Sequence, residues 1–247
     1  MYGNIQTIKL KKMMNRRVKL SNIVLTFITI IAACLCSCTK IEDDEILSIP
    51  SSVTIYFGDK YQLNSYQEWK SSKPFIATVD GSGTIVANHA GGCTVSCPKG
   101  SCTLNVIPTT TLYNEPICGY DVTPNIIISK YGQPDYWNDN YGYMVYETGV
   151  YSTPYMYFKY DTNTGRLKGS VIIIKRSLLD QLCEHLNQRY ARQDANYYIW
   201  ADEYINNNSN ITKYVSLKEA YIPLIGTYGE TMYYTDCFGV WYEPVNP

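Results

Sequence analysis

The chain has 247 residues, enough for one large domain or two small ones. Hydrophobic residues make up 45% and charged residues 17%, which excludes a disordered or highly charged chain. Six of the 21 basic residues lie within residues 1–37, which contain no acidic residue, so the rest of the chain carries 15 basic against 22 acidic side chains. That negative charge repels a phosphate backbone, and we expect no nucleic-acid partner.

The amino end has the features of an export signal. Arg16, Arg17 and Lys19 precede an apolar run over residues 23–37. A basic segment followed by an apolar one is typical of a signal peptide. Because the run is shorter than the ~20 residues of a membrane-spanning helix, we expect residues 1–37 to be removed.

The end of this run carries a second sign of export. Leu35-Cys36-Ser37-Cys38 resembles the lipobox of bacterial lipoproteins, which implies a lipid on Cys38 and an anchor in the outer membrane. Cys34 is the alternative lipidation site. The acidic tether over residues 38–46 is similar to that of surface-exported lipoproteins of the Bacteroidetes. We therefore expect exposure at the cell surface, with a periplasm-facing protein as the alternative.

Residues 47–108 have the pattern of a small all-β domain. Short alternating segments are separated by turns rich in Gly, Asp, Ser and Pro, with no helical period between them. This spacing predicts a β-sandwich. The predicted strands are 53–57, 76–79, 84–87, 93–97 and 102–106.

The same segment resembles the bacterial Ig-like group 2 (BIG2) domain. The matching positions are Trp69, Ser71, Ser72, Pro74, Ile76-Ala-Thr-Val-Asp80, Gly83, Ile85, Ala87, Gly91 and Val95. The resemblance implies an Ig-like sandwich that spaces or presents other domains and has no catalytic activity. We expect Trp69 to lie in its core, against Ile85, Val95 and Leu104.

Six cysteines lie outside the signal and lipobox, and three of them fall in one predicted hairpin. Cys97 and Cys102 flank a predicted four-residue turn, where cross-strand neighbours come close enough to form a disulfide. Buried free thiols explain the pattern equally well. A zinc site of His89, Cys93, Cys97 and Cys102 is the weakest interpretation, because this spacing is not that of a standard zinc motif.

Residues 109–247 are predicted to form a second, tyrosine-rich domain of the α+β class. Thr123-Pro124 begins a short helix that ends at Gly132, and Ser177 begins a second helix in a capping-box-like pattern. Between and after them we expect an antiparallel sheet with the helices on one face, in the order α-β-β-β-α-β-β-β. The predicted strands are 142–148, 154–160, 166–174, 196–201, 213–221 and 231–237.

All but four of the 25 tyrosines fall in this second domain. Tyrosines can fill one face of a half-exposed sheet, or they can contact sugars and protein partners. Two aromatic pairs beside polar residues, in predicted loops, are the candidate ligand-binding residues: Tyr136, Trp137, Trp241 and Tyr242.

Catalytic patterns are weak in this sequence. It contains no G-x-S-x-G, P-loop or H-E-x-x-H motif, and only two histidines. His185 lies two residues from Cys183 on a predicted helix, so these side chains diverge, although Cys118 or Cys237 could approach it. We predict no catalytic residue, no resident metal and no cofactor.

The predicted function is therefore that of a lipid-anchored envelope protein. An Ig-like spacer presents a carboxyl-terminal domain that binds a protein or glycan ligand, as in adhesion. An envelope scaffold or assembly subunit is the alternative, followed by an enzyme whose site the sequence does not reveal.

Overall fold

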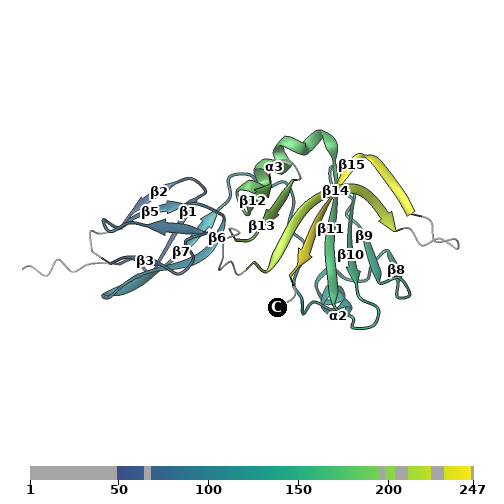
Figure 1. Ribbon diagram of the computed structural model, residues 1–247, viewed down its shortest axis with the longest axis horizontal. Coiled ribbons are helices and arrows are strands. Elements are labelled where there is room, and N and C mark those ends of the chain that lie inside the picture. Colours follow the sequence, from purple (N-terminus) through teal and green to yellow (C-terminus); the bar gives the residue numbers. More distant parts are fainter. Residues whose placement is uncertain (1–48, 64–67, 195–197, 204–210, 224–230, 246–247) are drawn as a thin grey trace, which may run out of the picture. The chain divides into compact units, whose positions relative to one another are not determined.

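β-Strands are the main regular structure of the described residues, which also contain two short α-helices (Figure 1). The computed structural model describes residues 49–63, 68–194, 198–203, 211–223 and 231–245. The predicted signal, the lipidation site Cys38 and the tether lie outside these residues. Residues 49–247 form one compact unit, so a boundary at residue 108 stays a prediction.

Two small sheets occupy residues 52–107. Sheet A has the strand order β1-β7-β6-β3, with β1 parallel to β7 and the other pairs antiparallel. Sheet B has the antiparallel order β2-β5-β4. All five predicted strands are present, and β2 and β3 are additional. The bounds are β1 Ser52–Tyr56, β2 Lys60–Gln62, β3 Lys70–Ser71, β4 Ala77–Val79, β5 Thr84–Ala87, β6 Gly91–Cys97 and β7 Gly100–Ile107.

The inward side chains of sheets A and B form one apolar cluster. Strand β7 buries every second residue, Cys102, Leu104 and Val106, as the period of a half-buried strand requires. Trp69 is only 6% exposed and belongs to the same cluster as Ile85, Val95 and Leu104. The predicted core position of Trp69 is confirmed.

Residues 136–244 contribute the strands of one antiparallel sheet, sheet C. Its strand order is β12-β13-β14-β15-β11-β10-β9-β8. The bounds are β8 Tyr136–Asn138, β9 Tyr143–Glu147, β10 Tyr155–Tyr160, β11 Leu167–Lys175, β12 Ala191–Asp194, β13 Ile199–Ala201, β14 Lys213–Pro223 and β15 Thr231–Pro244.

Sheet C consists of two halves with the same order of elements. Helix α2 (Pro124–Tyr131) precedes β8 to β11, and helix α3 (Leu179–Asn187) precedes β12 to β15. The last strands of the halves, β11 and β15, pair at the centre of the sheet. The predicted order was wrong by one strand in each half, because β8 and β12 are short edge strands whose sequences lack clear alternation.

The two helices cover the same face of sheet C. Leu182 and Leu186 of α3 pack against Ile172 and Ile174 of β11 and against β15. Ile127 of helix α2 packs against Met144 of β9 and Phe158 of β10. These side chains lie on the same face of the sheet as Ile172, because Met156, two residues before Phe158, pairs with Ile172. The predicted arrangement of an antiparallel sheet with helices on one face is confirmed.

The helix ends follow the predicted signals only in part. Pro124 begins α2, and Gly132 follows it with a φ of 83°, which favours glycine. Ser177 does not cap α3. It lies within a 3-10 turn, η1 (Arg176–Leu178), and the N-cap position of α3 is Leu178, which makes no side-chain cap bond. The chain thus enters α3 through a tighter turn than a capping box.

The opposite face of sheet C is lined by aromatic rings. Tyr157 and Trp241 meet edge-to-face with ring centroids 5.7 Å apart. The β14–β15 hairpin has a register shift at Glu219/Ala220. Beyond this shift, Tyr221 and Tyr234 contact rings of the same face. Bulges bend a strand and increase its twist, so the hairpin turns toward its own sheet. We call this set the aromatic face; its members are Tyr143, Tyr155, Tyr157, Tyr221, Tyr234 and Trp241.

Replacing Trp69 by Ala should strongly destabilise the protein, because it removes a large buried side chain from the apolar cluster of sheets A and B. We expect a loss of ~3–5 kcal/mol in the free energy of unfolding, measured by urea denaturation. Tyr56→Ala on strand β1 is the control, since Tyr56 is 55% exposed. A loss below ~1 kcal/mol for Trp69→Ala would contradict the core assignment.

Candidate functional site

The four predicted ligand-binding residues do not form one exposed cluster. Trp241 is 7% exposed and Tyr242 is fully buried, so the expectation that both are accessible was wrong. They lie in β15, which pairs on both sides, with β11 and with β14. Trp241 belongs to the aromatic face, and Tyr242 lies beneath α3, where its hydroxyl contacts that of Tyr113 at 2.8 Å.

Tyr136 and Trp137, in contrast, are accessible. They belong to strand β8, which forms one edge of sheet C, and their side chains are 40% and 45% exposed. The predicted loop is therefore a short strand. Exposed aromatic rings on a sheet edge are a candidate interaction site.

The polar atoms of both rings bond within the protein. The Trp137 indole Nε1 donates to the Tyr160 hydroxyl at 2.7 Å, and that hydroxyl donates to Asp139 at 2.6 Å. The Tyr136 hydroxyl donates to Glu147 Oε1 at 3.4 Å. Burial, together with the bond to Asp139, raises the pKa of Tyr160 to about 12. Because these bonds fix the rings, what the rings offer to a ligand is their carbon surface.

Carboxylates surround this strand. Asp135 precedes it and accepts the backbone N–H of Glu147, while Asp139 follows it. Residues 133–148 contain these three acids and no Lys or Arg. Tyr141, 66% exposed, lies in the turn after β8. We call this set the β8 edge site; its members are Asp135, Tyr136, Trp137, Asp139, Tyr141 and Glu147.

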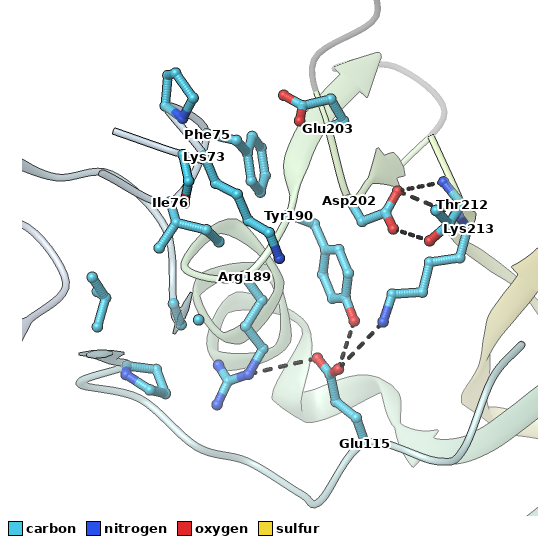
Figure 2. Close-up of a pocket in the computed structure, with 16 residues that line it drawn as sticks. Lys73, Phe75, Ile76, Glu115, Arg189, Tyr190, Asp202, Glu203, Thr212 and Lys213 are labelled. Carbon is cyan, nitrogen blue, oxygen red and sulfur yellow. Dashed lines mark hydrogen bonds and ion pairs between the residues drawn. The ribbon is translucent and has the colours of Figure 1, made fainter. Parts of the chain in front are cut away.

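A second region of polar side chains lies around Glu115. The Tyr190 hydroxyl donates to Glu115 Oε2 at 2.5 Å, Arg189 Nε lies 3.6 Å from Oε1, and Lys213 Nζ lies 4.0 Å from Oε2 (Figure 2). Arg189 also donates to the carbonyl of Thr110 at 2.9 Å. These bonds attach the segment before α2 to the turn that follows α3 and to β14.

A cavity of about 760 Å³ borders these groups. Figure 2 shows Arg189, Tyr190 and Lys213 directed toward Glu115, and Asp202 directed toward Thr212. Asp202 accepts the backbone N–H of Thr212 at 2.9 Å and its hydroxyl. Three acidic and three basic side chains line the cavity, and Glu115 pairs with Arg189 and Lys213 while Asp202 bonds to Thr212, so these contacts help to hold the fold. The charged residues that line the cavity are Lys73, Glu115, Arg189, Asp202, Glu203 and Lys213.

His185 lies beside this network and is fully buried. Its Nδ1 accepts the backbone N–H of Leu112 at 3.1 Å, and its Nε2 lies 4.0 Å from Glu115 Oε1. Burial, with a smaller contribution from Arg189, lowers the pKa of His185 to about 3. The ring is therefore neutral at pH 7.

The cysteines have the surroundings of buried thiols. Burial raises the pKa of Cys118 to about 12 and that of Cys237 to about 11. Cys118 donates to the carbonyl of Tyr242, and the Nδ1 of His185 is occupied by the backbone N–H of Leu112. Thiols with raised pKa values are poor nucleophiles at neutral pH.

The Cys97–Cys102 disulfide is absent from the described structure, in which both thiols are free. Cys102 pairs with Val95, and Cys97 pairs with Gly100, so the two cysteines are not opposite each other. The turn comprises only Pro98 and Lys99 rather than the predicted four residues, which shifts the register. This geometric expectation was wrong, and the alternative of free thiols fits.

The weakest cysteine hypothesis was a zinc site with His89. The His89 ring stacks on Phe75 with centroids 4.0 Å apart, and its Nδ1 lies 2.8 Å from the Phe75 carbonyl oxygen. Across the described residues, no three His, Cys, Asp or Glu side chains converge as metal ligands do.

Sequence reasoning missed two features of the site. It placed Tyr136 and Trp137 in a loop, because three residues between turn-forming neighbours show no strand period. It also missed Glu115, whose partners Arg189 and Tyr190 lie in the turn after α3 and whose partner Lys213 lies in β14. No local pattern could have identified a contact between residues so far apart in the chain.

No protein-family model matches the chain, and no curated protein matches it in sequence. Within the described segments, none of the helices has the length and apolar character needed to cross a membrane. The β8 edge site is therefore identified from its own geometry, and the resemblance of residues 47–108 to a BIG2 domain stays a prediction.

Gly142→Ala should destabilise the protein more than Gly149→Ala. Both glycines have a positive φ, 67° and 69°, which costs an alanine about 1–2 kcal/mol. At Gly142 an added Cβ would also lie 2.2 Å from the Tyr160 carbonyl oxygen, whereas nothing lies within 4 Å at Gly149. We expect the Gly142 variant to lose at least ~1 kcal/mol more, measured by urea denaturation. Equal losses would contradict the tight turn that supports β8.

The buried His185 should make the protein less stable in acid. Its pKa lies below the ordinary value of 6.5 only in the folded state, so the unfolded chain binds the extra proton as the pH falls. The contribution is complete above pH 6.5 and is lost between that value and about pH 3. Compared with His185→Gln, the wild type should lose up to ~1.4 kcal/mol more per pH unit in this window.

The His185 measurement is the free energy of unfolding against pH for both proteins. Carboxylates such as Asp161, whose pKa is lowered chiefly by its bond to Lys168, act equally in both and cancel in the difference. Parallel curves for wild type and variant would show that His185 is not buried as a neutral ring.

Proposed function

We propose that this chain is a lipid-anchored envelope protein whose sheet C binds a protein or glycan ligand at the β8 edge site. Sheets A and B act as an Ig-like spacer between the anchor and the binding region. The observation that carries the proposal is the exposure of Tyr136 and Trp137 on an edge strand. Large rings kept accessible at a sheet edge have a cost in solubility, which a binding role explains.

Contrast with the aromatic residues at the centre of sheet C supports this choice. Tyr157, Trp241 and Tyr242 are buried, and their rings pack against strands or α3. Packing in the core of sheet C thus accounts for these aromatic residues. The side chains of Tyr136 and Trp137 are much less buried. The hydrogen bond from Trp137 to Tyr160 holds the indole ring in a fixed orientation. A ring that is both accessible and ordered loses little entropy when a ligand binds.

The Ig-like spacer is supported by the residues that make up the resemblance. Trp69 is a buried member of the apolar cluster of sheets A and B. The turn Asp80-Gly-Ser-Gly83 is closed by the Asp80 carboxylate, which accepts the backbone N–H groups of Ser82 and Thr84 at 2.9 Å. The Ser82 hydroxyl, which donates to the same carboxylate at 2.6 Å, is the main cause of the lowered pKa of Asp80, and the backbone bonds add to it.

Anchoring is supported by the sequence alone. The basic segment, the apolar run and the Ser37-Cys38 pair are the elements that a lipoprotein signal requires. An acyl chain on Cys38 would place the spacer and sheet C outside the membrane, on the outer membrane surface or, as the alternative, in the periplasm.

The binding proposal is tested on arrays of glycans and of matrix proteins probed with the full chain. Wild-type protein should bind at least one ligand, and Trp137→Ala should weaken that binding about tenfold or more. Tyr56→Ala is the control, because Tyr56 is an exposed tyrosine on β1, outside the β8 edge site. Binding that is unchanged in Trp137→Ala, or absent in the wild type, would contradict the proposal.

The anchoring proposal is tested by fractionation of cells that express the chain with its native signal. Cys38→Ala should move the protein from the membrane to the soluble fraction, and Cys34→Ala should leave it in the membrane. The reverse pattern would assign the lipid to Cys34.

A further inference from the structure

Strand β8 leaves one edge of sheet C open. It pairs with β9 on its inner side, through Tyr136↔Val145, Trp137↔Met144 and Asn138↔Tyr143. None of the described strands pairs with its outer side. The opposite edge strand, β12, differs: its Ala191 is 3% exposed and lies in the cluster formed by sheets A and B. Of the two edges, the β8 edge is thus the accessible one.

Tyr136 and Trp137 lie on opposite faces of this edge. Successive side chains of a strand alternate, and the contacts follow the alternation. Trp137 bonds to Tyr160, which belongs to the cluster beneath α2. Tyr136 pairs with Val145 and lies on the other face, where Val145 packs against the rings of the aromatic face. The two rings therefore cannot form one flat platform for a sugar. They lie on either side of the line that an added strand would follow.

The negative charge beside strand β8 favours a positively charged partner segment. Asp135, Asp139 and Glu147 lie at the ends and on the neighbour of β8, and residues 133–148 contain no Lys or Arg. Lys159 of β10, two strands inward, has its Nζ over the Tyr143 ring, so the acids outnumber the cations at this edge. A second copy of the chain would bring the same acids against these, which is unfavourable. A segment that carries Lys or Arg would instead pair with them, and its cations could stack on the rings.

We propose that the β8 edge site binds an extended, Lys- or Arg-bearing segment of a partner protein, which adds to sheet C as a strand beside β8. This inference rests on the proposed function and names its class of partner. Main-chain hydrogen bonds supply the alignment, and the two rings with the surrounding carboxylates supply the selectivity. Because β8 is only three residues long, most of the affinity comes from the side chains.

The test is a titration of the full chain with fluorescent peptides of about eight residues, the length of an ordinary strand. The binding probe alternates pairs of threonine and lysine, so that lysine occurs on both faces. A second peptide replaces lysine by glutamate, and a third carries N-methyl groups on alternate residues, which removes backbone donors. The first peptide should bind most tightly, the N-methylated peptide should bind more weakly because it lacks main-chain donors, and the glutamate peptide should not bind. Added salt should weaken the binding of the first peptide.

Variants locate the binding. Trp137→Ala should weaken it about tenfold or more, and Glu147→Lys should weaken it several-fold while leaving the Trp137 bond to Tyr160 in place. Asp121→Lys is the matched control, because it makes the same charge change at a side chain that is 95% exposed and outside the site. Thermal melts confirm that each variant folds.

Three results would overturn the inference: no binding of the basic peptide up to about 1 mM, equal binding of the N-methylated peptide, or binding unaffected by both Trp137→Ala and Glu147→Lys. A dimer of the chain that is lost in Trp137→Ala would replace the partner by a second copy. Glycan binding through Trp137 without peptide binding would leave the proposed function intact and refute strand addition. Failure of both arrays and peptides would refute both.

Discussion

The antiparallel pairing of β11 with β15 holds sheet C together. Each is the last strand of its half, and no other ladder among the described strands joins the halves. Residues 171–174 of β11 are at most 4% exposed, because the helices cover one face of the pair and the aromatic face covers the other. Since both halves are built outward from this pair, the first strand of each half, β8 and β12, lies at an edge.

This construction gives the many tyrosines two roles according to their position. Near the centre, Tyr157 and Tyr242 are buried, and burial raises the pKa of both well above the ordinary value. They are part of the core. At the β8 edge no further described strand covers the rings, so Tyr136 and Trp137 remain exposed. Composition alone therefore overstates the binding surface, and the position of a strand in the sheet decides which rings a ligand can reach.

Local signals predicted the local elements of this fold. Pro124 and Gly132 bound α2, and alternation located most strands, because these patterns depend on neighbours in the chain. The exposure of Trp241 and Tyr242 was predicted wrongly, since the polar residues beside them suggested a loop. Whether β15 lies at the centre or an edge is decided by its pairing with β11, more than sixty positions away. The predicted pairing of Cys97 with Cys102 was also wrong, because the turn between their strands is shorter than the sequence suggested.

Hydrogen exchange of the full chain tests the central claim most directly, that the open β8 edge is where sheet C meets its ligand. In the free protein, amides of β11 and β15 at the centre should exchange slowest and those of β8 should exchange fast. Adding the ligand found on the arrays, or the basic peptide, should slow exchange at residues 136–138 and leave sheets A and B unchanged. Protection that appears around Glu115 and Lys213 instead, with β8 unaffected, would contradict the account.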